Sequence, residues 1–204
     1  MGARRLGQHF LTSFLRNQPC QSVITRNLYS EEHLGIPNFR RQRMLANERF
    51  GETMKGQYIE RLKEAVQESS QPVFSDDIKT LITLAESKAD IDLLVEMLRK
   101  YQKQSNELKP DFRFGPLVMR ALTLTNQVDL ALQLYKDNDL KQLFDQFTSV
   151  WLLLDLLYED ARCFDAVAIY EEFCQRHQET TIPAALTTLA LASCYKMASD
   201  ESFT

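Results

Sequence analysis

The sequence is poor in glycine, proline and cysteine, with six, six and four of them among 204 residues. So few turn-forming residues argue against a sheet with many tight turns and favour long helices. The four cysteines match no zinc-binding spacing and give no disulfide framework, so we expect free thiols. No run approaches the roughly 18–20 consecutive apolar residues that span a bilayer, so we predict no membrane insertion.

Acidic residues are absent from the first 30 positions. The basic residues of this segment are Arg4, Arg5, Arg16 and Arg26. An amphipathic start that contains Arg, Ser and Thr but no acid is typical of a mitochondrial transit peptide. We therefore predict a transit peptide over residues 1–30, cleavage near residues 28–30, and a location in the mitochondrial matrix. A merely disordered basic tail is the alternative.

Patterns that would indicate catalysis are also missing. The sequence has no Gly-rich phosphate loop, and its three histidines stand far apart from one another. We therefore predict that the protein is not an enzyme and that it needs neither a cofactor nor a metal. We interpret the carboxylates of Asp155, Asp160 and Asp165 as helix caps and solvated side chains.

Apolar residues recur at helical spacing, in pairs of helices, from about residue 74 onward. Three such hairpins are expected, with a bridging helix before the third and a single last helix from about residue 184 to residue 197. The second helices of two hairpins resemble each other at an interval of 35 residues, as Ala131 with Ala166 and Tyr135 with Tyr170 show. A period of this length, made of helix–turn–helix units, indicates an all-α solenoid of stacked hairpins.

Two further segments precede these hairpins. Residues 31–38 contain Gly35 and Pro37 close together and are expected to form a linker, followed by a locally basic helix over residues 39–66. We therefore divide the chain into a transit peptide (1–30), a basic linker and helical extension (31–73), and helical repeats (74–204) of which the last is incomplete.

The third hairpin resembles the pentatricopeptide repeat family. Residues 149–173 follow the repeat consensus without a gap, with matching side chains at Asp155, Leu157, Arg162, Ala166, Ile169, Tyr170, Glu171 and Glu172. The stretch from about residue 74 onward is also similar to one animal mitochondrial member of that family. The resemblance implies a short right-handed solenoid that binds single-stranded RNA and supports mitochondrial mRNA processing, maturation or stability.

In this family the first helix of each hairpin reads one base per repeat. The resemblance puts the main reading position on Lys79, Pro116, Trp151 and either Thr187 or Thr188. Only the threonine suits hydrogen bonding to a base edge, because proline has no donor and Trp151 is expected to pack in the core. A base code is therefore largely absent.

The distribution of charge along the chain favours a contact with RNA outside the base-reading positions. Residues 64–204 hold 13 basic and 23 acidic side chains, a field that repels nucleic acid except at a local basic patch. We predict phosphate contact through Arg40, Arg41 and Arg43, supported by Lys79 and Thr188. The alternative is a helical-repeat adaptor that binds proteins, such as a component of the small mitochondrial ribosomal subunit or an RNA-processing factor.

The last helix raises a separate expectation. Leu186, Leu189 and Ala190 lie on one apolar face together with Cys194 and Met197. A solenoid normally closes with a polar cap. We therefore predict either that the chain is a part of a longer protein or that the last helix packs against another molecule.

Overall fold

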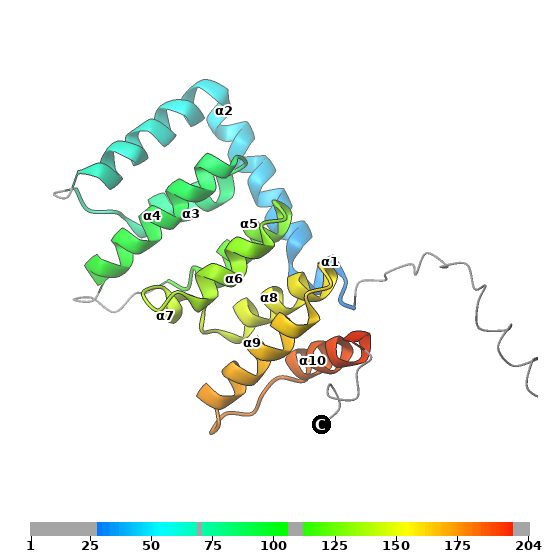
Figure 1. Ribbon diagram of the computed structural model, residues 1–204. Coiled ribbons are helices and arrows are strands. Elements are labelled where there is room, and N and C mark those ends of the chain that lie inside the picture. The colour runs from blue at the N-terminus through cyan, green and yellow to red at the C-terminus, as the bar shows by residue number, and fades with distance from the viewer. Residues whose placement is uncertain (1–27, 69–70, 106–111, 198–204) are drawn as a thin grey trace, which may run out of the picture.

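The computed structural model describes residues 28–68, 71–105 and 112–197, which form helices and no strands (Figure 1). The all-α hairpin array expected from the sequence is confirmed. The helices are α1 (Glu31–Leu34), α2 (Ile36–Gln67), α3 (Ser75–Leu84), α4 (Lys88–Ser105), α5 (Gly115–Leu124), α6 (Val128–Lys136), α7 (Lys141–Phe144), α8 (Phe147–Glu159), α9 (Cys163–Arg176) and α10 (Ala184–Met197).

Helices α3 and α4, α5 and α6, and α8 and α9 form three hairpins that stack in chain order, with α10 packed on the third (Figure 1). Helix α8 is the centre of the stack, because α5 lies against it from one hairpin while α9 and α10 lie against it from the other side. Every residue from Leu152 to Leu157 is accordingly buried. This explains why the sequence of α8 is apolar nearly all round.

The second and third hairpins turn in the same way, 35 residues apart. Asn126 and Ala161 each adopt a left-handed conformation, with φ of 51° and 58°. The following amide donates to the first helix, from Gln127 to Leu122 O at 2.9 Å and from Arg162 to Leu157 O at 2.8 Å. These bonds satisfy carbonyls that would otherwise be unpaired at a helix end. The repeat seen in the sequence is therefore also a repeat of backbone geometry.

Helix α5 begins where the backbone of the next unit comes very close. A Cβ atom on Gly115 would lie 2.3 Å from Leu143 O and 2.4 Å from Ser149 Oγ. Only glycine fits at such a contact. Gly115 therefore fixes the approach of the second hairpin to α7 and to the start of α8.

The expectation that residues 31–38 form a linker is wrong, because these residues form α1 and the first turn of α2. Gly35, with φ of 70°, forms the bend between the two helices, and Pro37 stands in the first turn of α2, where a missing amide proton costs nothing. Gly and Pro here mark a helix boundary rather than a flexible segment.

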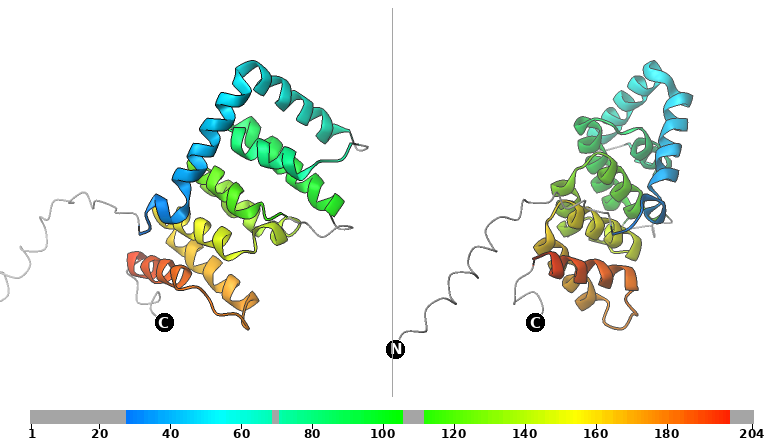
Figure 2. Two further views of the ribbon diagram at one scale, coloured as in Figure 1. Left: turned by 180° about the vertical axis from the view of Figure 1, so that it is seen from behind. Right: turned by 90° about the vertical axis from the view of Figure 1, so that its right-hand side faces the viewer.

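Helix α2 bends at Gly51, whose φ of 62° and ψ of 165° are not helical. Its second limb, residues 52–67, lies beside the first hairpin, and its first limb, residues 36–50, runs across the stack (Figure 2). None of the described helices is long and apolar enough to span a membrane.

The last helix differs from the expectation. Leu186, Leu189 and Ala190 are buried, because this face of α10 packs against α8 and α9 of the same chain. The expectation that this face is left for another molecule is therefore wrong for these three residues, whereas Cys194 and Met197 on the same face are half-buried. The exposed hydrophobic side chains of α10 are instead Leu191 and Tyr195, which are 65% and 78% exposed.

Candidate functional site

The three arginines predicted to contact phosphate lie on the first limb of α2, but two of them already have partners. Arg40 donates two hydrogen bonds to the carboxylate of Glu31, at 3.0 and 3.1 Å. Arg43 donates to Ala85 O at 2.6 Å, and burial lowers the pKa of its guanidinium. Arg41 is exposed and makes no hydrogen bond or ion pair with the described residues.

The contact of Arg43 has a structural consequence. Ala85 follows the last residue of α3, where the helix dipole is negative and carbonyls lack helical partners. The guanidinium of Arg43 therefore caps α3 and ties it to α2. Other basic residues of α2 are engaged similarly, with Lys55 paired to Glu86 at 2.7 Å. Several basic side chains of α2 therefore stabilise the fold through contacts within the chain.

We define the strap as residues 29–43. Its apolar side chains Leu34, Ile36 and Phe39 are at most 4% exposed. Tyr29 packs edge-on against Trp151, with ring centroids 5.1 Å apart, and Arg120 Nε donates to Leu34 O at 2.8 Å. The strap therefore covers part of α5 and α8, the helices that carry the predicted base-reading positions.

The predicted reading residues do not form one surface. Lys79 pairs with Asp76 at 3.0 Å, and its ammonium lies 4.2 Å from the centre of the Phe112 ring. Trp151 packs under the strap as part of the core, as expected. The hydroxyl of Thr188 donates to Ala184 O at 2.8 Å within its own helix. Lys79 contacts Phe112, which lines the cavity described next.

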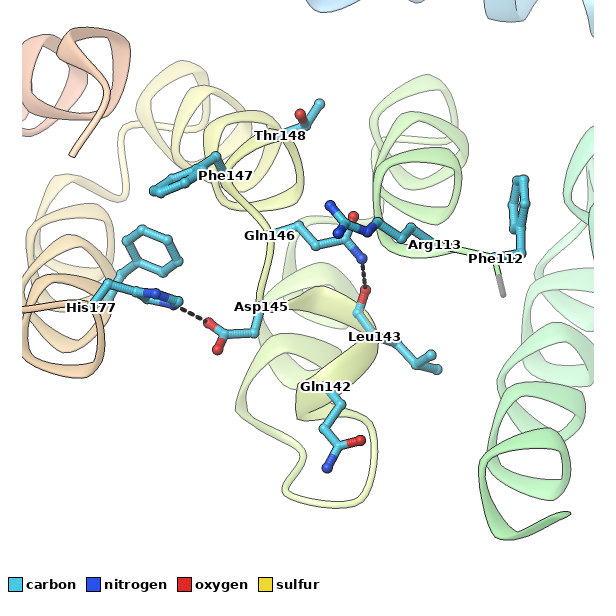
Figure 3. A pocket seen from close by; sticks show the side chains of 10 residues that line it. Phe112, Arg113, Gln142, Leu143, Asp145, Gln146, Phe147, Thr148 and His177 are labelled. Carbon is cyan, nitrogen blue, oxygen red and sulfur yellow. Dashed lines mark hydrogen bonds and ion pairs between the residues drawn. The ribbon is translucent and has the colours of Figure 1, made fainter. Parts of the chain in front are cut away.

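A cavity of about 440 Å³ opens between the second and third hairpins, beside α7 (Figure 3). Phe112 lies at one end and Phe147 and His177 at the other, with Arg113 and Gln146 between them. The complete lining is Phe112, Arg113, Gln142, Leu143, Asp145, Gln146, Phe147, Thr148, Phe173 and His177.

The charges around this cavity are unequally satisfied. Asp145 accepts from Arg176 at 2.6 Å and lies 3.1 Å from His177 Nε2, so this carboxylate is neutralised locally. Arg113 is exposed and forms no ion pair with any described residue. Its guanidinium is therefore available to an anion, while amide groups such as that of Gln146 can bond to a base edge.

The cavity combines aromatic faces, a free guanidinium and neutral amides. These are the groups that bind a nucleobase by stacking and its phosphate by charge. Within residues 28–68, 71–105 and 112–197, no three His, Cys, Asp or Glu side chains are placed to hold a metal ion.

Sequence reasoning missed this site, although the signal was present. Phe112 and Phe147 are 35 residues apart, as are Arg113 and Thr148. The same interval relates the second helices of the hairpins, so each pair occupies equivalent places in two neighbouring units. Comparing the residues around the start of each first helix would have found them.

Stacked hairpins with a 35-residue interval define the class as a helical-repeat protein of the pentatricopeptide type. The sequence profile of mitochondrial 28S ribosomal protein S27 matches residues 43–204, which is most of the chain. The chain belongs to this family of mitochondrial proteins.

Similar proteins carry the name pentatricopeptide repeat-containing protein 2, mitochondrial, which confirms the resemblance to an animal mitochondrial member of this class. The Xenopus laevis protein is 26% identical over 94% of this chain and 50% of its own length. The Pongo abelii and Homo sapiens proteins are 29% and 27% identical over 73% of this chain and 38% of theirs. The chain thus spans half or less of the length of these relatives. No solved structure matches it.

Proposed function

We propose that the protein is a non-catalytic RNA-binding protein of the mitochondrial matrix that supports mRNA processing, maturation or stability. The observation that carries this proposal is the cavity between the second and third hairpins. Phe112 and Phe147, in equivalent places of two repeats, offer rings to stack on, and Arg113 lies between them without an ionic partner among the residues that the structure describes. One base stacks on either ring while Arg113 contacts the adjacent phosphate.

The mode of contact differs from a base code. The positions that would read bases are a lysine, a proline and a half-buried tryptophan, with Thr188 bonded inside its own helix. Stacking tolerates any base, because every base has a π-face. Lys79, although paired with Asp76, places its ammonium against Phe112. Arg41 adds positive charge on the strap, at the other ends of α5 and α8. The expected binding is therefore weakly sequence-dependent and sensitive to salt.

The test is fluorescence anisotropy with a labelled mixed-sequence single-stranded RNA at 50 and 200 mM salt. Phe112→Ala with Phe147→Ala should weaken binding about 10-fold or more, since each lost stack is worth about 1–3 kcal/mol. Phe164→Ala is the matched control, because Phe164 is 76% exposed and distant from the cavity on α9. Arg113→Ala should reduce both the affinity and its dependence on salt.

Two results would count against this proposal. One is the absence of RNA binding by the wild type at 50 mM salt. The other is an equal RNA affinity of three variants: the double variant Phe112→Ala with Phe147→Ala, the variant Arg113→Ala, and the control Phe164→Ala. That result would place the contact elsewhere. Arg41→Ala then tests the strap directly, without disturbing the contacts of Arg40 and Arg43.

A second candidate function is that of a protein adaptor, for example in the small mitochondrial ribosomal subunit. The family profile carries the name of a ribosomal protein. Exposed hydrophobic side chains on the third hairpin and α10 suit a protein partner: Phe164, Leu191 and Tyr195. The test is whether the tagged wild type recovers small-subunit proteins from mitochondria. Loss of this recovery in Leu191→Ser with Tyr195→Ser, but not in the Phe112 and Phe147 double variant, would favour this function.

A further inference from the structure

A second cavity lies at the other end of α5 and α8, beneath the strap, with a volume of about 290 Å³. Its walls come from the strap, from the end of α5 with its turn, and from the end of α8. The lining residues are Glu31, Leu34, Ile36, Arg40, Thr123, Leu124, Asn126, Asp155, Leu156 and Glu159. Because it involves neither Phe112 nor Phe147, it is independent of the proposed RNA contact.

The carboxyl groups of this cavity are incompletely satisfied. Asp155 is 4% exposed, and its Oδ1 accepts no hydrogen bond from the described residues. Glu159, one helical turn further along α8, likewise has a buried Oε1 without a partner. Burial of such groups without hydrogen bonds is costly. The expectation that Asp155 is a cap or a solvated side chain is therefore wrong.

The positive charge within reach does not compensate these carboxylates. Arg40 lines the cavity, but both hydrogen bonds that it makes with the described residues go to Glu31. The strap thus contributes one acid and one base, and α8 contributes two further acids. The residues lining the cavity from α5 and its turn, Thr123, Leu124 and Asn126, do not titrate. The cavity therefore has an excess of negative charge.

The remaining walls are apolar. Leu34 and Ile36 from the strap, Leu124 from α5 and Leu156 from α8 line the space beside the carboxyl pair. A bare metal ion does not fit this description, because no three acidic or other ligating side chains of the described part converge on one point. A cationic group on a methylene chain does fit, because the chain contacts leucine and isoleucine while the charged end meets the carboxylates.

We propose that this cavity is a binding site for an alkylammonium group, which Asp155 and Glu159 bind by charge-assisted hydrogen bonds and whose methylene chain packs on Leu34, Ile36, Leu124 and Leu156. The group comes either from a free aliphatic polyamine or from a lysine side chain of a partner protein. Occupancy stabilises the strap against α5 and α8, because the ligand contacts both walls.

The experiment measures the thermal midpoint of the full chain with and without 10 mM 1,4-diaminobutane, at pH 8 and constant ionic strength. Binding should raise Tm by at least about 2 °C, since a ligand that binds only the folded state stabilises it by mass action. In Asp155→Asn with Glu159→Gln this rise should disappear. Glu171→Gln with Glu179→Gln is the matched control, because it removes the same charge from two exposed positions, one on α9 and one in the loop after it, and should keep the rise.

Further arms make the result decisive. Glu159→Gln alone, at a half-buried position, should reduce the rise and covers the case in which the double variant fails to fold. Spermidine and Nα-acetyl-lysine methylamide distinguish the two sources, since a stronger effect of either identifies it. No rise in the wild type, or the same rise in the wild type and in a folded cavity variant, would overturn the proposal.

Discussion

The two ends of α5 and α8 are built from the same repeat but are covered differently. At their starts, Phe112 and Phe147 line a cavity that the chain leaves open. At their ends, the strap lies across the hairpin turns, with Phe39 buried and Arg43 bonded to Ala85 O. The repeat thus supplies equivalent positions in each hairpin, while a segment outside the repeat decides which of these positions a ligand can reach.

The largest expected effect on stability comes from the strap, at the covered ends of α5 and α8. Phe39→Ala should lower the free energy of unfolding by about 3–5 kcal/mol, because it leaves a cavity where a side chain 2% exposed had packed. Met44→Ala, on the same limb but 55% exposed, should change it by less than about 0.5 kcal/mol. Urea denaturation followed by circular dichroism measures both.

Phe147→Ala tests the open end in the same way, since Phe147 is only partly buried there. Its cost should be well below that of Phe39→Ala. A cost as large as that of Phe39→Ala would show that the aromatic cavity is part of the core and would remove the distinction between the two ends.

The next effect depends on pH. Burial, and then the charge of Glu159, raises the pKa of Asp155 to about 7. In the unfolded chain this pKa is about 3.9, so between about pH 4 and pH 7 the unfolded state ionises first and folding stability falls as pH rises. Asp155→Asn, which cannot ionise, should therefore be more stable than the wild type by about 4 kcal/mol at pH 8, a gap that closes near pH 4.

The measurement is urea denaturation from pH 4 to pH 8 in amine-free buffer, so that no ligand occupies the cavity beneath the strap. Glu171→Gln, at an exposed position, is the control and should track the wild type throughout. A gap between wild type and Asp155→Asn that stays constant across this range would contradict the raised pKa.

The smallest effect separates two neighbouring arginines of the strap. Arg43→Ala should cost about 1–2 kcal/mol, because it removes a charged donor from the carbonyl of Ala85 at the end of α3. Arg41→Ala should leave stability within about 0.5 kcal/mol, since Arg41 is exposed. Thermal and urea denaturation check the pair. Equal costs for the two variants would mean that Arg43 does not cap α3.

Much of the architecture could be predicted because it depends on local spacing. The 35-residue interval between Ala131 and Ala166 marks two equivalent helices, and the structure repeats it in the turns at Asn126 and Ala161. The linker over residues 31–38 could not be predicted correctly, since a bend at Gly35 between two helices and a flexible segment share the same Gly and Pro signal.

The candidate sites were harder to predict. An arginine on a basic helix looks the same in sequence whether it faces solvent, as Arg41 does, or caps another helix 42 residues away, as Arg43 does. Asp155 stands at helical spacing among leucines, and only the packing of α5, α10 and the strap around α8 shows that it is buried.

The sequence by itself determined that the protein is a stack of helical hairpins, because hydrophobic spacing and a 35-residue period dictate which faces must be buried. Only the tertiary structure decided which surfaces remain available. The bends at Gly35 and Gly51 lay the strap across the ends of α5 and α8, so that their starts stay open while Trp151 and Asp155 are covered. The physical reason is that burial depends on contacts between segments distant in the chain, which local periodicity does not encode.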